Sequence, residues 1–207
     1  MVSKETKARA REFYCSLGAT LREHGFRGTG GHWYRRHPFA TICIGVEVSA
    51  RYGLDEPITF GIGLAIDQLY DRWERPSRGK VPKLDHCHYS RSIGWLNSYF
   101  NPDPFMRLDH ADRQVVDQYL SLKIRSYTTD EQFAERLNKA EVLLVEIGLP
   151  LFQSWLEPSV LLAHLDGMKP ESDWDARSML ELAEAVRALP VDPAGMEFGE
   201  STIRTGR

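Results

Sequence analysis

The chain has 207 residues, of which 42% are hydrophobic and 27% are charged, and its formal net charge is -3. This length supports one sizeable core, and the slightly acidic charge disfavours nucleic acid as a partner. No apolar run approaches the roughly 18 residues of a membrane span, and the N-terminus has no apolar stretch typical of a signal peptide, so we expect a soluble, cytoplasmic protein with no membrane partner.

We expect one domain over residues 1–190 and a loosely ordered tail over residues 191–207, where glycine and charge outweigh apolar residues. The three cysteines, Cys15, Cys43 and Cys87, are an odd number without CxxC spacing. A disulfide framework or a zinc knuckle is therefore not expected, and we interpret all three as free thiols.

The first element that the sequence predicts is a helix over residues 4–24, in which apolar side chains recur at helical spacing. Gly25 can take the left-handed conformation that ends a helix, and Phe26 then packs back on Leu21. The glycine-rich residues 27–31 faintly resemble a phosphate loop. Such loops lead from a strand into a helix, whereas these residues lead from a helix into a strand, so we reject a nucleotide site.

Alternating apolar and small residues predict two long strands over residues 39–48 and 58–66. With a shorter strand over residues 32–36 they predict an antiparallel meander, because no crossover helix intervenes. A fourth strand is expected over residues 88–96. The second face of residues 58–66 carries only Thr, Gly and Ala, so it either lets a ligand approach the sheet or receives the first helix, and we favour the helix.

Beyond residue 100 the apolar period becomes helical. The sequence predicts helices over residues 108–119, from a capping box at Thr129 to Gly148, from Pro158 to about Leu165, and from Ser172 to about Leu189. A helix, then strands, then helices indicates an α+β fold with the helices on one face of an antiparallel sheet.

The opposite face of the sheet is expected to stay uncovered and to present aromatic, His and Arg side chains to a partner. An exposed Trp beside arginines, as at Trp73 in a basic, proline-containing loop, has the composition of a binding hot spot. The side chains that we assign to binding are Trp33, Arg35, Trp73, His86, His88 and Arg91.

Residues 84–92 combine His, Cys, Asp and Arg side chains and are the best candidates for chemistry. On a strand His86 and His88 would point to the same side and could bind a metal, with Asp109 or His110 as a further ligand. We favour the alternative, a polar patch that enters a strand. The sequence carries no GxSxG, HExxH or GxxxxGK[ST] motif, and we predict no cofactor.

Several short motifs in this order resemble domain-of-unknown-function family 4304 over about residues 5–165. They are His24-Gly25-Phe26-Arg27, Trp33-Tyr34-Arg35-Arg36, two long strands, Cys87-His88-Tyr89-Ser90-Arg91-Ser92-Ile93-Gly94 and Gly148-Leu149-Pro150-Leu151-Phe152. The resemblance implies an α+β fold and brings no established catalytic residues. Small bacterial domains of this kind resemble immunity proteins, which neutralise toxins by direct binding.

Our first hypothesis is therefore a non-enzymatic protein-binding module whose partner is a protein such as a toxin or effector. The alternative is a metal-dependent hydrolase or metal-binding protein that uses His86 and His88. A nucleic-acid binder, the third possibility, would show affinity that falls steeply with salt.

Overall fold

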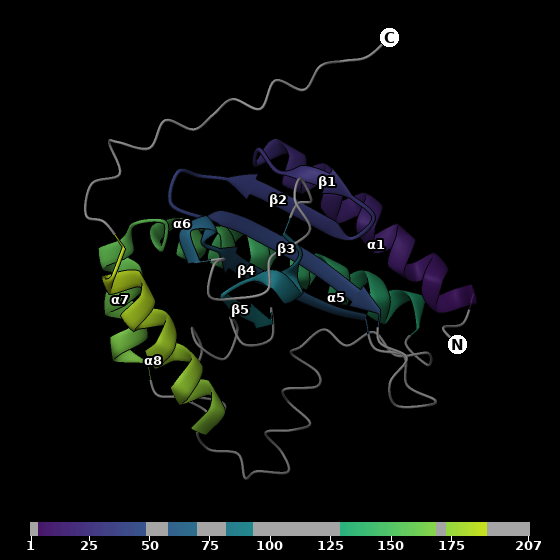
Figure 1. Cartoon of the computed structure of the whole chain (residues 1–207). Helices are drawn as coiled ribbons and strands as arrows, with labels where there is room; N and C mark the ends of the chain where they lie inside the picture. The colour runs from purple at the N-terminus through teal and green to yellow at the C-terminus, as the bar shows by residue number, and fades with distance from the viewer. Residues whose placement is uncertain (1–3, 49–57, 70–81, 93–128, 169–172, 190–207) are drawn as a thin grey trace.

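The computed structural model in Figure 1 describes residues 4–48, 58–69, 82–92, 129–168 and 173–189. An N-terminal helix, a five-stranded antiparallel sheet and C-terminal helices confirm the α+β prediction. The elements are α1 (Lys4–Glu23), β1 (Arg27–Thr29), β2 (His32–Arg36), β3 (Thr41–Val48), β4 (Ile58–Ala65), η1 (Asp67–Leu69), η2 (Leu84–His86), β5 (Tyr89–Ser92), α5 (Asp130–Val142), η3 (Leu143–Gly148), α6 (Leu149–Ser154), α7 (Pro158–Gly167) and α8 (Asp173–Arg187).

The end of α1 follows the sequence pattern closely. Gly25 has a φ of 78°. Its amide donates to the carbonyl of Arg22 at 3.0 Å, and the amide of Phe26 donates to the carbonyl of Leu21 at 2.9 Å. This pair of bonds is the Schellman arrangement, which satisfies carbonyls that the helix leaves unpaired. The predicted stop, including the return of Phe26 toward Leu21, is confirmed.

The strands form a meander in the order β1-β2-β3-β4-β5, with every neighbouring pair antiparallel. The strand β1 was not predicted. It exists because Gly30 and Gly31, with φ values of 64° and 85°, form a two-residue turn between paired Thr29 and His32. Two residues with left-handed angles match the twist of a hairpin, so this glycine-rich segment is the turn that connects β1 to β2.

One face of the sheet, which we call the bulky face, carries large side chains and packs against helices. The ring of Phe13 in α1 meets Phe60 of β4 at 5.7 Å, and Trp33 of β2 lies under Gly18 of α1. Figure 1 shows α5 crossing the same side of the sheet. Two rows of paired residues run across this face: Trp33, Ile44, Ile62 and Arg91, and Arg35, Ile42, Leu64 and Tyr89.

The other face, the small-residue face, is covered in a way that the sequence did not predict. A Cβ placed on Gly61 would lie 2.6 Å from Leu84 Cδ2, and one placed on Gly63 would lie 2.8 Å from the Sγ of Cys87. Leu84 also lies against Gly45. The segment around η2, in teal in Figure 1, therefore lies directly on the glycines, on the side opposite α5.

Two expectations about these faces were wrong. The first helix packs on the bulky face, because Phe13 and Leu17 need large apolar partners there, so it does not fill the small-residue face. The aromatic residues Trp33 and Tyr89 also lie on the bulky face and are buried, so they do not lie on the opposite face, which was expected to be uncovered and to carry such residues.

The capping box of α5 is confirmed. Thr129 Oγ1 accepts a bond from the amide of Gln132 at 3.2 Å, and Gln132 Oε1 accepts one from the amide of Thr129 at 3.2 Å. The predicted stop at Gly148 is wrong, because Gly148 keeps right-handed helical angles. A π turn, η3, in which the amide of Leu149 donates to the carbonyl of Leu144, widens the helix before Pro150, and the chain continues as α6.

The helices α7 and α8 begin and end close to the predicted residues, and Figure 1 shows them side by side at one end of the sheet. The expected helix over residues 108–119, the remainder of the fourth strand, the tail over residues 191–207 and Trp73 lie outside the described residues. Among the helices that the structure describes, none is long and apolar enough to cross a membrane.

Candidate functional site

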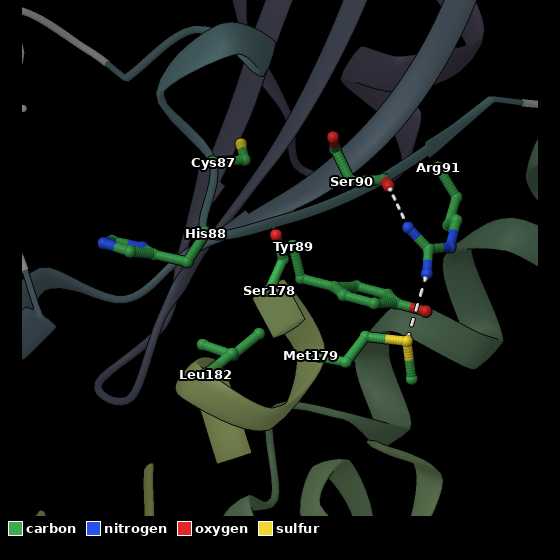
Figure 2. Close-up of a pocket in the computed structure, with 8 residues that line it drawn as sticks. All are labelled: Cys87, His88, Tyr89, Ser90, Arg91, Ser178, Met179 and Leu182. Carbon is green, nitrogen blue, oxygen red and sulfur yellow. Dashed lines mark hydrogen bonds between the residues drawn. The ribbon is translucent and has the colours of Figure 1, made fainter. Parts of the chain in front are cut away.

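A hollow of about 150 Å³ lies between the strand β5 and the helix α8 (Figure 2). The strand and the two residues before it contribute one wall, and three residues of α8 contribute the other. The lining residues are Cys87, His88, Tyr89, Ser90, Arg91, Ser178, Met179 and Leu182. No carboxylate is among them, and Arg91 brings a positive charge.

Tyr89 anchors the strand side of the hollow to the bulky-face core. Its ring packs against Trp155 at 5.4 Å, and its hydroxyl lies 2.9 Å from Nε2 of His164 and 3.2 Å from the sulfur of Met168. The imidazole of His164 in turn stacks on Trp155 at 4.1 Å. Tyr89 is therefore fixed at both its ring and its hydroxyl, which gives β5 a rigid attachment to α7.

Arg91 lies over the anchored tyrosine ring, with its guanidinium carbon 4.5 Å from the ring centre. The guanidinium also donates to the carbonyl of Ser90 at 3.1 Å and lies 3.8 Å from the sulfur of Met179 on α8 (Figure 2). A cation held on an aromatic face and bonded at its end has few accessible rotamers. Burial, and then the nearby Arg91 charge, lower the pKa of His164 to about 4, so this imidazole is neutral near pH 7.

His88 lies at the other end of the hollow from Arg91 in Figure 2. Its Nδ1 accepts a bond from the amide of Ile66 at 3.0 Å, and burial lowers its pKa to about 4. A neutral imidazole with an accepting Nδ1 carries its proton on Nε2, so His88 is a hydrogen-bond donor on its remaining nitrogen.

The two histidines of the alternative metal site do not share a strand face. Residues 84–86 form the turn η2, so the strand geometry on which that alternative depended is not found. The Nδ1 of His86 accepts a bond from the amide of Lys83 at 3.1 Å, as that of His88 does from Ile66. Each imidazole already uses the one lone pair that a neutral ring could offer to a metal.

The other proposed ligands, Asp109 and His110, lie outside the part of the chain that the structure describes. Among the described residues, no group of three or more His, Cys, Asp or Glu side chains is placed to hold a metal ion. The described lining therefore combines serine hydroxyls with the guanidinium of Arg91, and the Nδ1 atoms of His86 and His88 are bonded to the backbone.

Of the five described residues that the sequence assigned to binding, His88 and Arg91 line the hollow and the other three do not. Trp33 is 2% exposed and belongs to the core. Arg35 lies over the ring of Phe26 at 5.0 Å and within 3.4 Å of Gln153, a separate place on the bulky-face side. His86 belongs to η2, and Trp73 is outside the described residues.

Sequence reasoning missed the contribution of α8 and of His164. The helical period identified Met179 as part of an apolar stripe, but no local pattern says which strand that stripe will meet. The one available signal was the alternation in residues 89–92, which places Tyr89 and Arg91 on the same face.

Comparison with known proteins gives one match. No curated protein and no solved structure matches the chain. The family described as a domain of unknown function (DUF4304) matches residues 17–140, which include all five strands, whereas α6, α7 and α8 follow the matched region. Because this match spans more than half of the 207 residues, the chain belongs to the DUF4304 family.

Proposed function

We propose that this protein is a non-enzymatic protein-binding module and that the hollow between β5 and α8 receives an acidic group of its partner. The observation that carries the proposal is the part of the lining that the structure describes, in which the guanidinium of Arg91 lies with the hydroxyls of Ser90 and Ser178. Such a lining is complementary to a carboxylate, since charge-assisted bonds from Arg are among the strongest that a protein offers.

The rigidity of Arg91 supports a binding role. Its guanidinium is held by the ring of Tyr89 at 4.5 Å, and Tyr89 is itself held by His164 and Trp155. A side chain that is already ordered loses little conformational entropy when a ligand arrives. Arg in a partly desolvated place, beside apolar Met179 and Leu182, has the surroundings of an interface hot spot.

The chemistry of the potential nucleophile argues against catalysis at this site. Hydrogen bonding to Cys43, then burial, raises the pKa of the Cys87 thiol well above its usual value. The thiolate is the reactive form, so Cys87 is a poor nucleophile near pH 7. The alternative of a metal-dependent hydrolase built on His86 and His88 has no contact that favours it, because both Nδ1 lone pairs accept backbone amides.

The proposal is tested by purifying the tagged protein from cells of its natural source, after mild crosslinking, and quantifying the captured proteins by mass spectrometry. Three proteins are compared: wild type, Arg91→Met and Arg177→Met. Arg177 is an exposed arginine of α8 next to Ser178 and does not line the hollow, so it is the matched control. Circular dichroism of each variant establishes that it is folded.

We expect one protein to be enriched with wild type and Arg177→Met and to be reduced about tenfold or more with Arg91→Met, because removal of a central arginine costs about 1.4 kcal/mol or more at a binding hot spot. Capture that is equal for all three proteins, or no enriched protein at all, contradicts the proposal. A toxin as the partner is the narrower proposal, and it predicts that co-expression of wild type, but not Arg91→Met, restores growth to cells that produce the captured protein.

A further inference from the structure

Two of the three cysteines meet on the small-residue face, although they are 44 positions apart in the sequence. Cys43 of β3 is paired across the sheet with Gly63 of β4, and Cys87 occupies the space that a side chain on Gly63 would fill, with its Cβ and Sγ both 2.8 Å from that position. Cys87 also packs against the small cluster formed by Cys43 and Ala65. Gly63 therefore makes room for one thiol beside another.

The backbone holds the two sulfurs toward the same place. The Sγ atom of Cys43 lies 3.4 Å from the carbonyl oxygen of Pro82, and that of Cys87 lies 3.4 Å from the carbonyl oxygen of the next residue, Lys83. Cys87 packs against Cys43, and the two thiols are within hydrogen-bonding reach of one another. The Cβ atoms of a disulfide lie about 3.5–4.5 Å apart, so two thiols that are already in contact need only a local rearrangement to form the bond.

We propose that Cys43 and Cys87 form a dithiol that a low-molecular-weight disulfide, such as oxidised glutathione, converts into an intramolecular disulfide. This inference goes beyond the binding role and does not depend on it. Both thiols are free in the structure described here, so the dithiol is the starting state.

The order of the two steps follows from exposure. Cys43 is 1% exposed, whereas Cys87 is only partly buried and lines the hollow, so Cys87 reacts first. Because the pKa of Cys87 is raised, only a small fraction of the protein carries its thiolate near pH 7, and this fraction grows as pH rises. That thiolate attacks one sulfur of the oxidant, which breaks the oxidant's S–S bond, forms a mixed disulfide and releases one reduced thiol. The sulfur of Cys43 then attacks Cys87 Sγ, forms the Cys43–Cys87 bond and releases the second reduced thiol. Two electrons and two protons pass from the protein to the oxidant.

The bond would tie the segment around η2 to β3. That segment now rests on the sheet through Leu84 and Cys87, and residue 88 leads from it into β5 at the wall of the hollow. A covalent link there limits the excursions of the segment in both the folded and the unfolded chain. The oxidised protein is therefore expected to unfold at a higher temperature than the reduced protein.

The test uses full-length protein with Cys15→Ser, which removes the exposed cysteine of α1 and with it disulfide-linked dimers. The folded protein is incubated with oxidised glutathione, the remaining thiols are alkylated, and intact mass and tryptic peptides are measured. We expect a mass lower by two hydrogens, no alkylation, a peptide that links residues 43 and 87, and a higher Tm that returns to its starting value after reduction. The reaction is expected to accelerate as pH rises, because a raised pKa leaves little thiolate at neutral pH.

Two further variants in the same background separate the steps. Cys43→Ala is expected to stop at the mixed disulfide, with one glutathione on Cys87, whereas Cys87→Ala is expected to leave Cys43 unmodified while the protein is folded. The proposal is overturned if the folded Cys15→Ser protein keeps two alkylatable thiols, or if the link appears only in denaturant.

Discussion

The two faces of the sheet are built on the same strands but reach close packing by opposite means. On the bulky face, large side chains such as Ile62 and Leu64 fill the space between the sheet and the helices. On the small-residue face, Gly61 and Gly63 have no side chain, and a short turn lies directly on the backbone. The bulky face is therefore closely packed because its side chains are large, and the small-residue face is closely packed because its glycines leave room for the turn.

Neighbouring residues of one strand should therefore respond in opposite ways to a change in side-chain size. A truncation should be costly on the bulky face, since it leaves a cavity, and an enlargement should be costly on the small-residue face, since it creates a clash.

The largest effect is expected for Ile62→Ala on the bulky face. Ile62 is fully buried between Ile44 and Arg91 of the neighbouring strands, so the variant loses apolar burial and leaves a cavity. We expect the free energy of unfolding to fall by about 2–5 kcal/mol in urea titrations. The control is Leu180→Ala, a truncation at a side chain that is 58% exposed, for which a change within about 0.5 kcal/mol is expected. Equal losses for the two variants would contradict the burial argument.

A smaller effect is expected for Gly61→Ala on the small-residue face. The added Cβ would lie 2.6 Å from Leu84 Cδ2, and we expect a loss of about 1–3 kcal/mol from overpacking. In the Leu84→Ala background the clashing atom is absent, so the same substitution should cost clearly less. A double-mutant cycle measures the difference.

Gly167→Ala is the matched control for this cycle, because its added Cβ meets no atom within 4 Å and α7 accepts alanine at that position. It should be neutral or slightly stabilising in both backgrounds. If Gly61→Ala costs the same with and without Leu84, the turn does not rest on the glycines in solution.

The two faces also differ in how well the sequence predicted them. The alternation in residues 58–66 placed Ile62 and Gly61 on opposite faces, and the stop at Gly25 and the cap at Thr129 followed from local rules. Local rules did not predict which residue covers the glycines, because Leu84 is separated from Gly61 by more than 20 residues and their contact is tertiary.

The candidate site was predictable to the same limited degree. The sequence identified His88 and Arg91, which lie in one short segment, and it missed the wall that α8 supplies. Gly148 was misjudged for a related reason. A glycine followed by an apolar residue and a proline is a local stop signal, but apolar contacts of Leu149 and Phe152 with the core favour continuation through a π turn.

The smallest effect concerns pH and depends on His164 and His88. Burial lowers the pKa of His164 and of His88 from 6.5 to about 4, so between these pH values the unfolded chain binds more protons than the folded chain. Stability is therefore fully present above pH 6.5 and is lost as pH falls toward 4. One such group contributes at most about 1.4 kcal/mol per pH unit, and solvent screening at half-buried side chains reduces this slope.

Replacement of His164 by Gln should flatten this dependence. Glutamine can keep a hydrogen bond to the hydroxyl of Tyr89 but cannot take up a proton, so the variant loses one of the two titrating groups while the contact at the core remains. Urea titrations at a series of pH values between 4 and 7 measure the slope, and His88→Gln gives the share of the second group. Parallel slopes for wild type and His164→Gln would mean that His164 does not resist protonation, and hence that the stack of His164 on Trp155 is not maintained in solution.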